Sequence, residues 1–170
     1  YGLGNQAGNN GAKKWSAQFL YFHGPFAATG VYQYVNFNNS PGDLVNVPQF
    51  GTIVPFKSQS VAQLGASYDL KVVKFYGQYM YTKNDNLTGG SWHVNTGQGG
   101  VTVPVGPGTV MASFAYSRDA GGLDQTRRTW ALGYDYPLSK RTDLYAAYMN
   151  DKLSSLSTGQ TVGAGIRAKF

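Results

Sequence analysis

The chain has 170 residues, enough for one domain, and no cysteine, which excludes disulfides and thiolate metal sites. Charged residues make up only 13%, and all eight acidic residues are aspartates, so the usual filling of exposed helices is scarce. The net charge of +6 comes from scattered basic residues in runs of no more than two, a pattern that argues against nucleic-acid binding.

No stretch of 18 consecutive apolar residues is present, which excludes a transmembrane helix. A membrane remains possible, because a strand of a transmembrane barrel needs only about 9–11 residues with every second one apolar. The chain opens without the pattern of a signal peptide. Residues 1–12 resemble the end of a loop, so we expect further chain upstream.

Apolar and polar residues alternate along almost the whole chain, which indicates β-strands. The first strand places Trp15 and Phe19 on one face and Ser16 and Gln18 on the other. Later segments repeat the pattern up to the carboxyl end, where Ile166 is one of the apolar residues. The spacing predicts nine strands, at 13–22, 26–37, 60–70, 72–82, 98–105, 109–118, 127–136, 141–150 and 160–170.

The connections are predicted to alternate in length. Tight turns rich in Gly, Pro, Asp and Ser are expected near 23–25, 69–71, 105–108 and 137–140. Longer joins are expected at 38–59, 83–97, 119–126 and 151–159. Short turns on one rim and longer loops on the other are typical of an up-and-down β-barrel of the outer membrane.

The apolar face carries aromatic residues near the expected strand ends. Tyr and Trp at these depths place an apolar ring in lipid and a polar group at the headgroups. The opposite face is mostly Gly, Ala, Ser, Thr and Gln, whereas a soluble β-sandwich or lipocalin-like barrel, the main alternative, would place charged residues there. The expected membrane-interface aromatics are Trp15, Tyr34, Tyr81, Tyr116, Trp130 and Tyr148 towards one rim, and Tyr68, Tyr136 and Phe170 towards the other.

The last third of the chain resembles the carboxyl end of Gram-negative general porins, especially the β-proteobacterial type. The resemblance rests on the run Leu132–Tyr145, which contains Tyr-Asp-Tyr-Pro-Leu-Ser-Lys-Arg-Thr-Asp-Leu-Tyr, and on the ending Ile166-Arg-Ala-Lys-Phe170. The terminal Phe170, with apolar residues at every second position before it, is similar to the signal read by the outer-membrane insertion machinery. Upstream of residue 109 the resemblance is one of pattern only.

This resemblance implies an integral protein of the Gram-negative outer membrane, in contact with lipid and lipopolysaccharide. It further implies a 16-stranded, trimeric channel for passive diffusion of small hydrophilic solutes, narrowed by an inward-folded loop. The nine strands would then be strands 8 to 16 of an all-β transmembrane barrel. Residues 1–12 would end an extracellular loop, and residues 13–170 would form the carboxy-terminal part of the barrel domain.

If the apolar face is outside, the other face lines the pore. It would carry six basic and three acidic residues, which favours small anionic or neutral solutes over cations. Rim positions also suit headgroup binding by Arg141, Arg167 and Lys169, and pairing of the nearby aspartates with Arg141. The expected pore-lining residues are Lys14, Lys74, Arg127, Arg141, Arg167, Lys169, Asp69, Asp135 and Asp143.

We expect no enzymatic activity and no cofactor. His23 and His93, the two histidines, fall in a turn and a loop on opposite rims, so no Ser/His/Asp set is assembled with them. The competing function is a barrel that acts as an adhesin or structural anchor through its long loops. Small pore-facing side chains favour the channel, because small or plugged barrels fill their interior with large ones.

Overall fold

The structure, a computed structural model, describes residues 13–37, 56–87, 89–121 and 124–169. Residues 1–12, expected to end a loop, and the terminal Phe170 lie outside the described residues. None of the described residues forms a helix long and apolar enough to cross a membrane.

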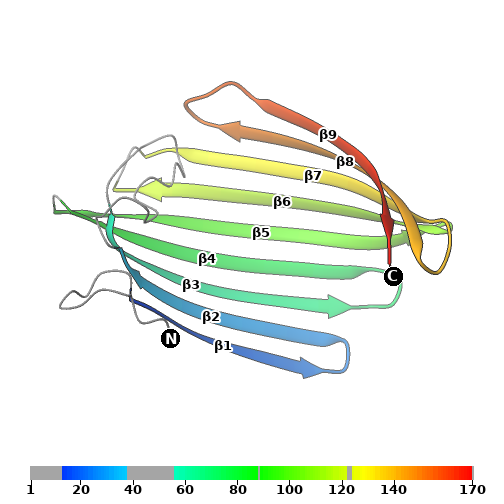
Figure 1. The fold of residues 1–170 in the computed structure, drawn as a ribbon, viewed down its shortest axis with the longest axis horizontal. Helices are drawn as coiled ribbons and strands as arrows, with labels where there is room; N and C mark the ends of the chain where they lie inside the picture. The colour runs from blue at the N-terminus through cyan, green and yellow to red at the C-terminus, as the bar shows by residue number, and fades with distance from the viewer. Residues whose placement is uncertain (1–12, 38–55, 88, 122–123, 170) are drawn as a thin grey trace.

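Nine antiparallel strands form one sheet, in which every strand pairs with its neighbours in the sequence (Figure 1). The predicted all-β, up-and-down order is therefore confirmed. The strands are β1 (Lys14–His23), β2 (Phe26–Asn36), β3 (Phe56–Asp69), β4 (Lys74–Asn86), β5 (Ser91–Val105), β6 (Gly108–Ala120), β7 (Thr126–Pro137), β8 (Thr142–Leu153) and β9 (Gly159–Ala168).

The hairpin of β4 and β5 is longer than predicted. The region 83–97 was expected to be a loop, but β4 continues to Asn86 and β5 begins at Ser91. Their pairing runs up to Asp85 opposite Ser91, because a ladder is held by backbone hydrogen bonds and does not need apolar side chains. This hairpin projects beyond its neighbours at one rim of the sheet (Figure 1).

The two rims differ less than the sequence predicted. One rim, here called the turn rim, carries the connections 24–25, 70–73, 106–107 and 138–141. The opposite loop rim carries 37–55, 87–90, 121–125 and 154–158. Only the first of these is long, so the prediction of four long joins was wrong. Polar strand ends were mistaken for loop because their composition resembles that of loops.

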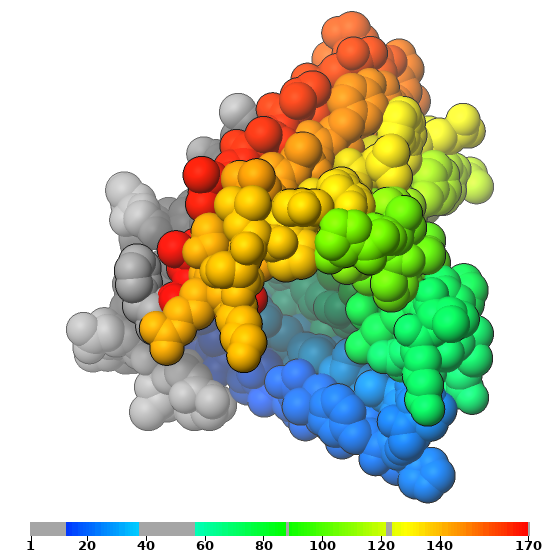
Figure 2. Space-filling model, turned by 90° about the vertical axis from the view of Figure 1, so that its right-hand side faces the viewer, coloured from blue at the N-terminus to red at the C-terminus, as the bar shows by residue number. Residues whose placement is uncertain are grey.

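The sheet is strongly curved and encloses a hollow (Figure 2). Its strands arch from β1 and β2 on one side to β8 and β9 on the other. Few side chains are buried, and the apolar ones form a small cluster at the loop rim. That cluster comprises Val35, Phe37, Trp92 and Val94, with the partly buried Leu153 packed against it. The fold therefore exposes two long faces, one convex and one concave.

Candidate functional site

Most of the exposed large apolar side chains lie on the convex face, whereas Leu20 and Phe22 of β1 lie on the concave face and line the hollow. Large apolar residues stay exposed on the convex face, including Leu132 (49% exposed) and Ile166 (68%), as the alternation predicted. The concave face surrounds a hollow of about 790 Å³. Its wall is formed mainly by small or uncharged residues of the opposite parity, among them Thr29, Gly65, Ser67, Gln98, Gly100 and Ser113.

A ladder of amides crosses the middle of the concave face. The Gln63 amide donates to Gln78 Oε1 over 3.0 Å, and the Gln78 amide donates to Gln98 Oε1 over 2.6 Å. These three residues come from β3, β4 and β5; Gln78 and Gln98 are direct cross-strand partners, whereas Gln63 and Gln78 are diagonal neighbours. Facing the hollow, they provide an uncharged hydrophilic surface that water can wet.

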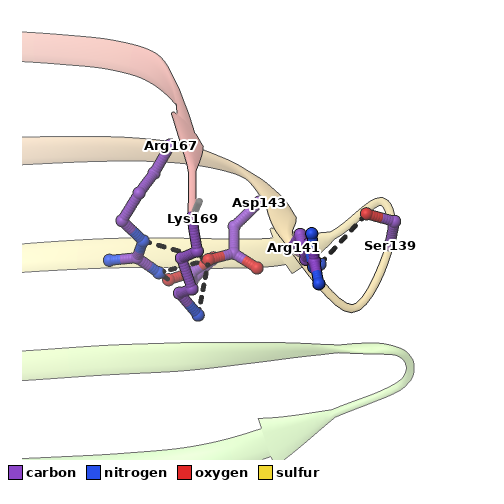
Figure 3. Close-up of polar contacts among 6 residues, drawn as sticks. Ser139, Arg141, Asp143, Arg167 and Lys169 are labelled. Atoms are coloured by element: carbon purple, nitrogen blue, oxygen red, sulfur yellow. Dashed lines mark hydrogen bonds and ion pairs between the residues drawn. The ribbon is translucent and has the colours of Figure 1, made fainter.

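An ion-pair cluster occupies the concave face at the turn rim (Figure 3). Arg167 Nη2 lies 2.6 Å from Asp135 Oδ2 and 2.7 Å from Asp143 Oδ2. Lys169 Nζ approaches the same Asp143 oxygen at 3.4 Å. One guanidinium thus joins β7, β8 and β9, the last three strands of the sheet.

The suggested pairing of the two aspartates with Arg141 was wrong. Asp143 lies directly opposite Arg167 across the β8–β9 ladder, which brings their side chains together. Arg141 precedes β8 in the turn, where its backbone N–H donates to Ser139 Oγ over 3.1 Å (Figure 3). Among the described residues, Arg141 makes no ion pair.

A second ion pair lies on the concave face near the loop rim. Arg127 Nε and Nη2 donate to Asp151 over distances of 2.8 to 3.1 Å, and the Thr129 hydroxyl also donates to that carboxylate, over 2.5 Å. Asp151 was missed because strand β8 was expected to end at residue 150. Its alternation with Asp143 and Met149 could have placed it on this face.

The other predicted wall residues also occupy strand positions that face the concave side. Lys14 and Lys74 make no ion pair within the described part of the chain, and Lys74 Nζ lies 5.4 Å from the ring centre of Tyr76. Asp69 Oδ1 accepts the backbone N–H of Lys71 over 2.8 Å, which closes the turn between β3 and β4. Asp119, also missed, is buried (2% exposed) on this face opposite Val94.

The charges on the concave face therefore differ from the prediction in number but not in sign. It carries the six expected basic residues and five aspartates, Asp119 and Asp151 being added to the three expected ones. Three basic residues are in ion pairs, whereas Lys14, Lys74 and Arg141 have no carboxylate partner among the described residues. The charged side chains that stay accessible and without an ion pair on this face are therefore mainly cationic.

The expected interface aromatics within the described residues all occupy strand positions that face the convex side. Trp15 packs near Tyr32 and Tyr34, with ring centres 5.0 and 6.4 Å away, towards the loop rim. Trp130 and Tyr148 form a pair at 5.1 Å and lie nearer the middle of their strands than expected. Tyr81 and Tyr116 lie towards the loop rim, and Tyr68 and Tyr136 towards the turn rim.

Comparison with known proteins gives the family. Residues 1–156 match the family described as Gram-negative porin. The chain belongs to the Gram-negative porins. It is therefore an integral protein of the outer membrane, and the porin family and fold are those of channels rather than enzymes.

Individual porins resemble the chain over part of their length. Outer membrane porin protein 32 of Delftia acidovorans is 37% identical over 95 residues, which cover 54% of this chain and 27% of that protein. A structure named as an anion-selective porin from Comamonas acidovorans superposes with a TM-score of 0.72 and 25% identity, covering 92% of this chain and 49% of its own.

A more distant porin shares the fold alone. The trimer form of OmpT from Vibrio cholerae has a TM-score of 0.65 at 12% identity, covering 90% of this chain and 54% of its own. The chain thus spans about half the length of the solved porins that it matches.

Proposed function

We propose that the concave face of this porin is part of the wall of a water-filled channel for passive diffusion of small hydrophilic solutes. The difference between the two faces carries this proposal: exposed apolar side chains cover most of the convex face, and the amide ladder and the ion pairs of Arg127 and Arg167 lie on the concave one. Such a surface suits lipid on one side and water on the other.

Anion preference is supported by which charged side chains of the concave face are neutralised in ion pairs and which are not. Arg127, Arg167 and Lys169 are largely neutralised by aspartates, so the field of the wall comes mainly from Lys14, Lys74 and Arg141, opposed by the exposed Asp69. A low-dielectric wall focuses that positive field and raises the local anion concentration. The structural relative from Comamonas acidovorans, named as anion-selective, supports the same preference.

The sheet is proposed to be the carboxy-terminal part, residues 13–170, of a 16-stranded barrel. Within the described residues, β1 pairs only with β2 and β9 only with β8. Open edges are very unfavourable in hydrocarbon, since every backbone N–H and C=O there needs a partner. The trimer form of the Vibrio cholerae relative supports a homotrimer.

The membrane contacts follow from the same orientation. The convex aromatics are proposed to lie at the two lipid–water interfaces, next to lipid and lipopolysaccharide, and Phe170 is proposed to be read by the insertion machinery. The alternative of an adhesin or anchor has less support, because the matched relatives are porins.

Reconstitution of the intact protein into a planar bilayer under a salt gradient tests this function. We expect stepwise conductance and a reversal potential of the sign that indicates anion preference. A reversal potential of the opposite sign would end the proposal of anion preference. Absence of conductance steps from correctly inserted protein would end the channel proposal itself.

A further inference from the structure

Two large apolar side chains of β1 lie on the concave face, which is the water side of the proposed channel. Leu20 is 59% exposed and Phe22 is 73% exposed, and both line the hollow. Apolar side chains of this size gain free energy when an apolar partner covers them. Because they point into the hollow and away from the convex face, a partner must reach them from within the hollow.

An aromatic side chain of β4 faces them across a floor of small residues. Phe22 is directly opposite Ala27 of β2, and Ala27 is opposite Ser67 of β3. Ser67 in turn is opposite Tyr76 of β4, which is 44% exposed and also lines the hollow. The backbones of β1 and β4 are about 14 Å apart, three strand spacings of about 4.8 Å.

The curvature of the sheet turns this arrangement into a trough. Since the strands arch around the concave face, the larger side chains of β1 and β4 converge above the small residues between them (Figure 2). The space between them suits an apolar group of about one ring. We call it the β1–β4 trough, and it comprises Leu20, Phe22, Ala27, Ser67 and Tyr76.

A cation lies at the end of the trough that is nearer the turn rim. Lys74 precedes Tyr76 by two residues on the same face of β4, and its Nζ lies 5.4 Å from the centre of that ring. Lys74 makes no ion pair within the described residues, and Asp69, directly opposite it, accepts the backbone N–H of Lys71 over 2.8 Å. The ammonium can therefore donate to a carboxylate that a solute brings.

We propose that the β1–β4 trough binds organic monocarboxylates whose apolar body is about one ring in size, such as aromatic acids. The apolar body lies between the β1 side chains and Tyr76, and the carboxylate points towards Lys74. A hydrophilic acid of the same charge lacks the first contact, and a neutral aromatic amide lacks the second. The hollow of about 790 Å³ is of the size that small-molecule sites have. This inference rests on the proposed channel and its anion preference.

Block of the chloride current through the intact porin in planar bilayers tests the trough. The probe is benzoate, compared with acetate and with neutral benzamide, and the readout is the concentration that halves the chloride conductance. Benzoate should block at a concentration about tenfold lower than acetate, since a ring that loses about 60 Å² of exposed apolar surface gains roughly that factor in affinity. Benzamide should block more weakly than benzoate, because it brings no charge to Lys74.

Variants of the trough separate its two contacts. The double variant Leu20→Ser/Phe22→Ser should raise the half-blocking concentration of benzoate about tenfold, to that of acetate. Lys74→Gln should weaken block by benzoate and leave block by benzamide unchanged. The matched control is Tyr145→Ser, which removes a 43% exposed aromatic side chain of β8 from the concave face, away from the residues that line the hollow. It should be blocked like the original protein.

Equal block by benzoate and acetate would overturn the inference, as would unchanged block in the double variant or an equal loss in Tyr145→Ser. Lower stability of the double variant with unchanged block would also overturn it, and would assign Leu20 and Phe22 to a contact with another segment of the protein. If the double variant fails to insert, Ala27→Phe, which fills the floor of the trough, should still abolish the preference for benzoate over acetate. Chloride conductance is recorded first without benzoate, so failure of the channel proposal is seen separately.

Discussion

Single charges on the concave face have different roles because their partners differ. Arg167 is held between two aspartates, and Arg127 is held by Asp151 through two nitrogens. Lys74 makes no ion pair: the ring of Tyr76 lies beside it, and Asp69, directly opposite it in β3, accepts the backbone N–H of Lys71. The residues that are most firmly held therefore contribute least to the field in the hollow, and the unpaired ones contribute most.

This difference predicts opposite effects of two substitutions on ion selectivity. Lys74→Gln should lower the anion-to-cation permeability ratio about fourfold, because one unit charge roughly 10 Å away in water changes the local anion and cation concentrations about twofold each, in opposite directions. Asp143→Asn should raise the ratio, because it releases Lys169 and leaves Arg167 with one partner. Reversal potentials in planar bilayers measure both.

Lys83→Gln is the matched control, since Lys83 lies on the convex face and pairs with Asp85 at 3.2 Å. Its reversal potential should stay unchanged. Equal shifts for Lys83→Gln and Lys74→Gln would mean that the concave face does not control selectivity.

At the scale of the strands, alternation was sufficient to predict the number, order and facing of all nine. It failed at the strand ends, where β4 and β5 continue through Lys83 and His93 although their side chains are polar. Side-chain pattern reports which solvent a residue faces, whereas a ladder ends where backbone hydrogen bonding ends. Asp151 was missed for the same reason. It lies in strand β8, which extends three residues further than expected, and it pairs with Arg127 of β7.

The sequence also could not show which charged side chains form ion pairs with each other. The set Asp135, Asp143, Arg141 and Arg167 could be assigned to one wall from parity alone. Which arginine meets the aspartates depends on the register of β9 against β8, and that register is set by the whole ladder from Thr142 to Asp151.

The hairpin of β5 and β6 contains a glycine whose substitution should weaken the sheet. A Cβ added to Gly108 would lie 2.6 Å from the backbone O of Asp135 in the adjacent strand. Because that carbonyl cannot move without disturbing the β6–β7 ladder, Gly108→Ala should cost about 1–3 kcal/mol of the free energy of unfolding. Urea titration of the protein in lipid vesicles measures it.

Gly163→Ala in β9 provides the comparison, because a Cβ there would meet no atom within 4 Å. Its unfolding midpoint should match that of the unsubstituted protein. A loss of similar size in both variants would attribute the effect to strand glycines in general and not to the close approach at Gly108.

At the scale of the whole molecule, the sheet separates two solvents across a single layer of backbone. Leu132 and Ala131 are adjacent in the middle of β7, yet the register places Leu132 on the convex face beside Tyr148 and Ala131 on the concave face beside Ser113. Neighbouring residues in the chain should therefore tolerate the same substitution very differently.

Leu132→Arg places a cation in hydrocarbon and should cost about 2–4 kcal/mol of the free energy of unfolding in vesicles. Ala131→Arg places it in water, should cost much less, and should raise anion preference in bilayers. If the two variants lost the same stability, the assignment of the faces to lipid and water would be wrong.

The positions of the two histidines have a consequence for channel behaviour. His23 is opposite Phe26 on the convex face, and His93 lies beside Tyr81 on the same face, with ring centres 5.7 Å apart. Histidine is the side chain that ordinarily gains or loses a proton near neutrality, whereas Asp, Lys and Arg keep their charge there. In the described part of the wall no imidazole faces the hollow, so this part of the wall should add no histidine-dependent change of ion selectivity around neutral pH.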